Sequence, residues 1–134
     1  DERRAMLKQA RLLEESAEFE VDLALNDLLE NALGSYWQWY EAYREMSTMK
    51  QALAAAEFRF KAVRRQAIIG DKSMVDTLEA AIQVQDRSIR LKKARANFIT
   101  KRNELATYLW LEGLVPLDIR EASKPEFSQL PVFN

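Results

Sequence analysis

The sequence lacks cysteine and histidine entirely, and its 134 residues include only three glycines and three prolines. Without Cys or His the chain has no disulfide, no thiol nucleophile, no zinc or haem ligands and no acid–base group of the usual neutral-pH kind. The remaining carboxylates are a weak basis for an enzyme, so we expect no catalytic activity and no metal or other cofactor. Because Gly and Pro are scarce and 48% of the residues are hydrophobic, we expect one ordered, mostly helical domain.

Long apolar runs are also missing. No stretch of about 18 apolar residues and no charged-then-apolar leader occurs, so the sequence itself contains no membrane-spanning helix and we expect a soluble chain. The first residue is Asp1 rather than Met, from which we expect a processed or excised piece of a longer parent. The absence of cysteine does not identify the cellular compartment.

The net charge of −1 conceals an uneven distribution. Residues 1–47 carry 5 basic and 11 acidic side chains, residues 48–110 carry 13 and 6, and residues 111–134 carry 2 and 4. The basic middle part contains "RSIRLKKARANFITKR", a composition that also occurs in nucleic-acid-binding proteins. The aromatic residues do not interleave with these cations as a stacking platform requires. We therefore interpret the charges as the flanks of a coiled-coil seam and expect no nucleic-acid partner.

Heptad periodicity predicts the first helix, from about residue 5 to residue 69. Apolar residues alternate spacings of three and four, which keeps one seam facing a partner helix. Upstream of residue 39 the pattern continues with one extra step of four, a stutter that locally unwinds a supercoil. A helix of this length reaches roughly 100 Å. The seam consists of Trp39, Ala42, Met46, Met49, Leu53, Ala56, Phe60, Val63 and Ala67.

The stretch "QAIIGDKSMVDTLEAA" predicts a turn at residues 70–72 between two helices. Gly70 is suited to the left-handed conformation that ends a helix, and Ser73 with Asp76 has the spacing of a capping box. A second helix should follow over residues 73–111, antiparallel to the first, and end before Gly113. The predicted fold is all-α: a long antiparallel coiled-coil helical hairpin over residues 1–112 and an irregular, extended C-terminal tail over residues 113–134. Two apolar stripes on the second helix indicate neighbours on two sides, one containing Leu78, Ile82, Gln85 and Ile89, the other Val84, Leu91, Ala94 and Phe98.

Hairpin geometry places the end of the second helix opposite Leu33 and the segment "SYWQWYEAY", which is too short and too polar for a membrane belt. We expect an aromatic packing cluster there, formed by Tyr36, Trp39, Tyr40, Tyr43, Tyr108 and Trp110. Residues 1–31 have no helical partner in this hairpin, although they present apolar side chains. The tail is one candidate to lie partly along them; another copy of the chain or a missing part of the parent is the other. We expect the isolated chain to self-associate.

Specific motifs resemble one protein family. The run "GDKSMVDTLEA", continued by "LKKARANFITKRNELATYLW", is similar to the TolC family of outer-membrane efflux proteins, whose second repeat has a glycine turn, a small hydroxyl residue, a "VDxL(D/E)A" segment and a helix rich in "ARxxY/F". The resemblance covers roughly residues 53–112, and "ARLLEESAEFEVDLALNDLLENALGSYW" resembles the preceding helix of that repeat. The repeat's β-barrel strands are absent from this sequence.

The resemblance implies a homotrimeric parent in the outer membrane of a Gram-negative bacterium, acting in multidrug efflux or type I secretion. Its long helices would form a periplasmic duct that docks a membrane-fusion adaptor and an inner-membrane pump, and only the missing barrel strands would contact the membrane. It further implies a tip turn and adaptor contact at Gly70, Asp71, Lys72 and Ser73, with Lys72 tying neighbouring hairpins together. Asp76 and Glu79 would be pore-entrance acids.

Simpler interpretations of the same residues stand beside these. Helix capping alone explains Asp76, because a carboxylate is stabilised at a helix N-terminus. Glu79 is ordinary as a solvated residue, and a lysine such as Lys72 is ordinary in an exposed turn. The alternative function is a free-standing coiled-coil interaction module with no transport role. Strand segments and a second hairpin in the parent gene would separate the two functions.

Overall fold

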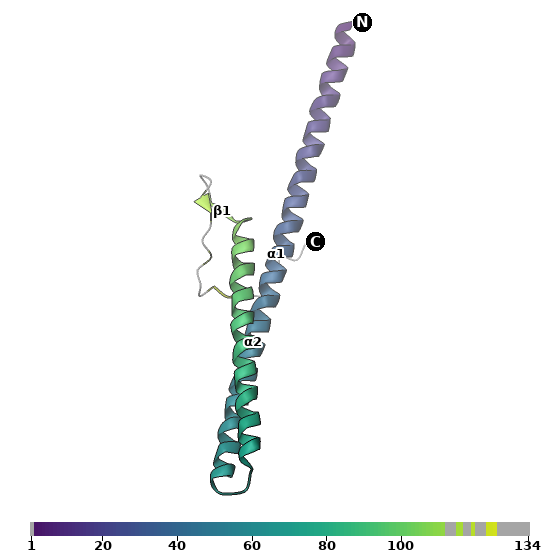
Figure 1. Cartoon of the computed structure of the whole chain (residues 1–134). Helices are drawn as coiled ribbons and strands as arrows, with labels where there is room; N and C mark the ends of the chain where they lie inside the picture. The colour runs from purple at the N-terminus through teal and green to yellow at the C-terminus, as the bar shows by residue number, and fades with distance from the viewer. Residues whose placement is uncertain (1, 112–114, 117–118, 120–122, 126–134) are drawn as a thin grey trace, which may run out of the picture.

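The computed structural model describes residues 2–111, 115–116, 119 and 123–125, and over these residues the fold is all-α (Figure 1). Helix α1 spans Glu2–Ile68 and helix α2 spans Met74–Ala106. Two short strands, β1 (Trp110–Leu111) and β2 (Val115–Pro116), pair with each other after α2. The chain reverses between the two helices, and α2 returns along the second half of α1, so the architecture is a helical hairpin.

Helix α1 is continuous over 67 residues, beginning at Glu2 instead of about residue 5 and ending at Ile68. No proline interrupts it, and its single interior glycine, Gly34, is tolerated within so long a helix. Its first half extends beyond the end of α2 (Figure 1). All of residues 2–31 are exposed, as expected for a segment without a helical partner in the hairpin.

The seam predicted on α1 is the face that α2 covers. Trp39 and Ala42 are buried, and the other seven members of the predicted seam are partly buried. On α2 the facing residues repeat with the same spacings of three and four. Small side chains at Ala42, Ala80 and Ala94 are buried in this interface, which lets the two backbones approach closely. The facing residues of α2 include Ala80, Val84, Leu91, Ala94, Phe98 and Leu105.

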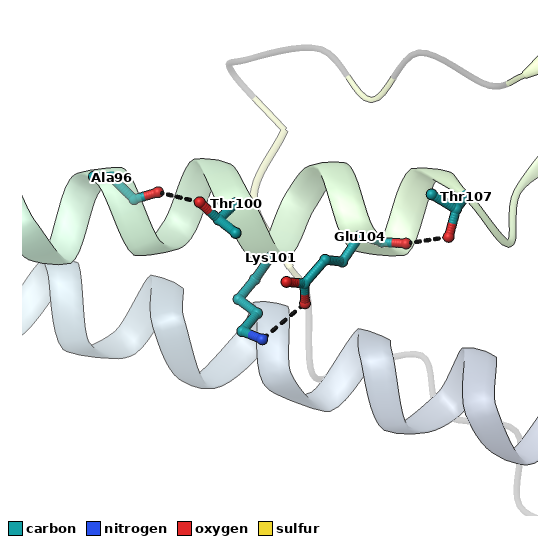
Figure 2. A network of polar contacts seen from close by, with 5 residues as sticks. All are labelled: Ala96, Thr100, Lys101, Glu104 and Thr107. Carbon is teal, nitrogen blue, oxygen red and sulfur yellow. Dashed lines mark hydrogen bonds and ion pairs between the residues drawn. The ribbon is translucent and has the colours of Figure 1, made fainter.

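Helix α2 ends at Ala106, before the predicted residue 111. The N–H of Thr107 still bonds to the carbonyl oxygens of Glu104 and Leu105, and its hydroxyl donates to the Glu104 carbonyl at 2.7 Å (Figure 2). The N–H groups of Tyr108 and Leu109 bond back to the carbonyl oxygens of Leu105 and Ala106 in turns, and β1 then pairs with β2 from Trp110. Aromatic and β-branched residues also have lower helix propensity than the Ala, Lys and Arg that precede them.

Among the described residues, a buried hydrophobic core lies near the middle of α1, beside the last third of α2. Its buried residues are Trp39, Ala42, Phe98, Leu105 and Ile119. Ile119 belongs to the tail, so the tail contributes one side chain to the core of the hairpin. Of the two candidates to cover residues 1–31, the tail does not do so in its described residues, because Ile119 is buried in this core while residues 2–31 are all exposed. Most of residues 113–134, predicted as an extended tail, lies outside the described part of the chain.

Candidate functional site

The turn at the tip is built by hydrogen bonds that end α1. Gly70 has a φ of 87°, in the left-handed region that favours glycine. The N–H of Gly70 donates to the Ala67 carbonyl at 3.2 Å, and the N–H of Asp71 donates to the Gln66 carbonyl at 2.9 Å. This pair of bonds is the Schellman arrangement, which satisfies carbonyl groups that a helix end otherwise leaves free. The predicted role of Gly70 in ending the first helix is confirmed.

The start of α2 is closed by the predicted capping box of Ser73 and Asp76. The N–H of Asp76 donates to Ser73 Oγ at 3.1 Å. In return, Asp76 Oδ2 accepts from the Ser73 N–H at 3.1 Å and from the Ser73 hydroxyl at 2.9 Å. These donors favour the ionised carboxylate, so they hold the pKa of Asp76 below its ordinary value of 3.8; the nearby charge of Lys72 acts in the same direction.

The two candidate pore acids, Asp76 and Glu79, differ in the hydrogen bonds that their carboxylates accept. They lie three residues apart in the first turns of α2 and so project from neighbouring positions of one face. The carboxylate of Asp76 is fixed by Ser73, whereas Glu79 is exposed. Gly70, Asp71, Lys72 and Ser73 are all exposed at the end of the hairpin (Figure 1). The structure thus brings every predicted tip residue to one end of the molecule, with Asp76 serving as a cap.

Sequence reasoning missed an apolar surface at this end. Five large apolar side chains flank the turn and are strongly exposed; we call them the apolar collar. Four of them lie within two residues of Gly70 or Ser73 and outside the seam on α1, whereas the fifth, Leu78, belongs to an apolar stripe that the sequence predicts on the second helix. Exposed apolar clusters of this kind mark interaction surfaces. The apolar collar consists of Ile68, Ile69, Met74, Val75 and Leu78.

Removing the Ser73 hydroxyl tests the capping box. Ser73→Ala should lower the free energy of unfolding of the hairpin by about 0.5–2 kcal/mol, because the Asp76 N–H loses its acceptor and the carboxylate loses a donor. Urea unfolding followed by circular dichroism measures the change. Ser88→Ala, in the interior of α2, is the matched control and should be close to neutral. Equal effects of the two substitutions would count against the cap.

The wild type and Ser73→Ala also test how the contribution of the capping box to stability depends on pH. The pKa of Asp76 is lowered on folding, so its stabilising bond with the Ser73 hydroxyl is fully present above the unfolded pKa of 3.8 and is lost as the pH falls through the folded pKa. The stability difference between the wild type and Ser73→Ala should therefore shrink between pH 7 and about pH 2. A difference that stays constant or grows on acidification contradicts this account.

The predicted aromatic cluster is only partly assembled in the described residues. The rings of Trp39 and Phe98 stack at 6.1 Å, and those of Tyr43 and Phe98 lie 5.9 Å apart. Tyr36 packs edge-on to Trp39, while Tyr40 packs against Trp37 instead.

The second helix contributes Phe98 to this cluster, a residue that the sequence interpretation had placed in a stripe and not among the aromatic partners. Tyr108 is 37% exposed because α2 ends before it, and the side chain of Trp110 lies outside the described part. Within that part, Ser35 Oγ and Trp39 Nε1 are buried without a hydrogen-bond partner.

Other chemistries find little support in residues 2–111 and the described parts of the tail. No group of three or more acidic side chains there is arranged to hold a metal ion. Neither described helix has a stretch long and apolar enough to cross a membrane. The hairpin tip, with its cap, its acids and the apolar collar, is the strongest candidate site. The chain matches no protein family model, and comparisons with curated proteins and with solved structures found no match.

Proposed function

We propose that this chain is a periplasmic duct hairpin of a trimeric TolC-family channel in the outer membrane of a Gram-negative bacterium. The observation that carries the proposal is an apolar stripe on α2 that α1 leaves uncovered. Val75, Leu78, Ile82, Ile89 and Ile99 are exposed, and they repeat with spacings that are multiples or sums of three and four. A helix with two apolar stripes needs a neighbour on each side, as in a closed wall of helices.

In this proposal the hairpin is an antiparallel coiled coil. The supporting evidence is the seam on α1, whose members alternate spacings of three and four and are all at least partly buried. Arg59 of α1 donates to Gln83 of α2 at 3.2 Å, a polar contact on the flank of the seam. Salt bridges on the surface of α2 join Asp86 to Arg90 and Lys101 to Glu104, and Figure 2 shows the second of them. Such exposed pairs add only about 0.3–0.5 kcal/mol each.

The tip is then the end that docks the membrane-fusion adaptor and, through it, the inner-membrane pump. Residues 70–73 supply an exposed polar turn held by hydrogen bonds to α1 and α2, and the apolar collar around it supplies area to bury in a contact. Asp76 and Glu79 would face the pore entrance in the trimer and attract cations. The protein would be a conduit, not an enzyme.

A free-standing coiled-coil interaction module is the second candidate, and the same uncovered stripe favours it. A module of this kind needs a helical partner but no channel. The two functions differ in the assembly that they require: a closed trimer with a lumen for the duct, and a solid bundle for the module.

The parent polypeptide that carries this segment decides between them. Purified from outer-membrane vesicles, it should have the mass of a trimer and should open ion-conducting channels in planar bilayers. Mass photometry and single-channel recording measure the two properties. A parent without strand segments and without conductance would overturn the duct and favour the module.

A further inference from the structure

We propose that a second copy of this chain covers the exposed half of α1, in a two-fold antiparallel dimer that places the N-terminal arm of each copy on α2 of the other. The proposal concerns the chain by itself and goes beyond the duct function. It rests on two segments that carry equal numbers of charged side chains of opposite sign and that also expose apolar side chains. It rests further on the positions of these segments along the hairpin.

The first segment is the acidic arm, residues 12–33 of α1. It contains seven acidic side chains and no basic one. The residues at 12–31 are all exposed, and within the described part of the chain none of the seven acids forms an ion pair. The arm also presents apolar side chains to solvent, among them Val21, Leu25 and Leu28. A partner surface that is both basic and apolar would stabilise this arm, because it would pair with the acids and bury the apolar side chains.

The second segment is the basic segment, residues 87–102 of α2. It contains seven basic side chains and no acidic one. Arg90 and Lys101 pair with acids of their own helix, whereas Lys92, Lys93 and Arg95 are exposed and have no ion pair among the described residues. Ile89 and Ile99, at either end, extend the uncovered stripe through this segment. Its charge and its apolar residues both complement the acidic arm.

The hairpin keeps these two segments apart within one chain. The acidic arm lies beyond or at the end of α2, whereas the basic segment lies beside the middle of α1 (Figure 1). Contact between them therefore requires two chains. If copies were related by a shift along the axis, each arm would contact the next copy and the assembly would be open-ended. A two-fold axis near Ser35 closes both contacts at once, because each copy then offers one arm and accepts one.

The exposed area is large enough for this dimer. The chain exposes 11547 Å² of solvent-accessible surface. A compact globular chain of the same mass exposes about 7,200 Å². A stable interface of standard size buries about 1,600 Å² in total. The elongated chain thus exposes more surface than a compact one, and the difference exceeds the area that a standard interface buries.

Charge reversal in mixed samples tests the pairing. Glu18→Lys with Asp22→Lys reverses the acidic arm, and Lys92→Glu with Arg95→Glu reverses the basic segment. Each variant alone should dimerise at least about tenfold more weakly than the wild type, because like charges then face each other. An equimolar mixture of the two should recover the wild-type affinity to within about threefold, since both contacts become opposite in sign again. Analytical ultracentrifugation measures the dissociation constants.

The mixture also controls for misfolding, because a variant that fails to fold cannot be rescued by a partner. Lys92→Arg with Arg95→Lys keeps the charges and should dimerise like the wild type. If the mixture remains as weak as its components, or if each variant alone dimerises like the wild type, the proposal is overturned. A strictly monomeric wild type at about 100 μM, well above the dissociation constants of standard interfaces, also overturns it.

Förster resonance energy transfer between labelled copies measures the relative orientation of the two chains in the dimer. The sequence has no native cysteine, so Met6→Cys and Lys72→Cys provide unique labelling sites. In the antiparallel dimer, a donor at residue 6 of one copy lies near an acceptor at residue 72 of the other and transfers efficiently. Donor and acceptor both at residue 72 lie about 100 Å apart and transfer little. Efficient transfer between two labels at residue 72, with little transfer between residues 6 and 72, would mean that the tips lie together and would overturn the antiparallel dimer. The proposed duct requires that arrangement with the tips together. Failure of one proposal is therefore distinct from failure of the other.

Discussion

Phe98→Ala should lower the free energy of unfolding of the hairpin by about 3–5 kcal/mol. The Phe98 side chain is only 6% exposed, and its ring stacks on Trp39 with an interplanar angle of 20°. Truncation removes buried apolar area, leaves a cavity beside Ala42 and Leu105, and removes two aromatic contacts from α2. Urea unfolding followed by the fluorescence of the tryptophans measures the loss.

Phe58→Ala is the matched control, because the side chain of Phe58 is 77% exposed on α1. It should change the free energy of unfolding by no more than about 0.5 kcal/mol. If both substitutions have the same effect, the core around Phe98 does not stabilise the hairpin as described. Both proteins are compared at one concentration, since self-association adds to apparent stability.

In the full-length parent, Asp76→Asn with Glu79→Gln should reduce the cation selectivity of the proposed channel and weaken its block by multivalent cations. Three copies would bring six carboxylates to one constriction, where the focused potential concentrates cations. The substitutions remove the charges while asparagine retains an acceptor for the Ser73 N–H and hydroxyl. Reversal potentials in salt gradients across planar bilayers measure the selectivity.

The single variants separate the two acids. Asp76 is engaged by Ser73 and Glu79 is free of that bond, so Glu79→Gln alone should alter selectivity without altering the thermal stability of the hairpin. Lys72→Gln is a useful opposite control, because it removes a positive charge from the same turn and should not reduce cation selectivity. Unaltered selectivity and block in the double variant would leave Asp76 as a cap and Glu79 as a solvated residue.

Local signals explain why much of the hairpin was predictable. The seam from Trp39 to Ala67 was read from spacing alone, and all of its members are at least partly buried. Gly70 and the pair Ser73 and Asp76 were equally readable, because a helix end and a capping box depend on residues within one turn of each other. These features need no knowledge of the rest of the chain.

The features that the sequence analysis did not predict depend mostly on contacts between residues far apart in the chain. The end of α2 at Ala106 is followed by turns and then by pairing between β1 and β2, and helical periodicity does not report such pairing. Phe98 stacks on Trp39, whereas Tyr108 lies beyond the end of α2 and is 37% exposed. The burial of Ile119 in this core was also out of reach, since nothing in a short tail segment encodes which helix it meets. Ile68, Ile69 and Met74 of the apolar collar belong to neither the seam nor a predicted stripe, so periodicity did not identify the collar as one surface.

The turn at Gly70 also bears on how the hairpin closes during folding. Contacts between α1 and α2 begin at short sequence separation beside the turn and become steadily more distant along the seam; at Arg59 and Gln83 the separation is already 24 residues. Each contact shortens the loop that the next one must close, so pairing that starts at the turn avoids most of the entropy of joining distant segments. The large side chains of Trp39 and Phe98 meet late on this route. We therefore expect the two helices to pair from the turn outward, with the contacts of the aromatic core forming late in folding. A substitution at Phe98 should then act mainly on the unfolding rate.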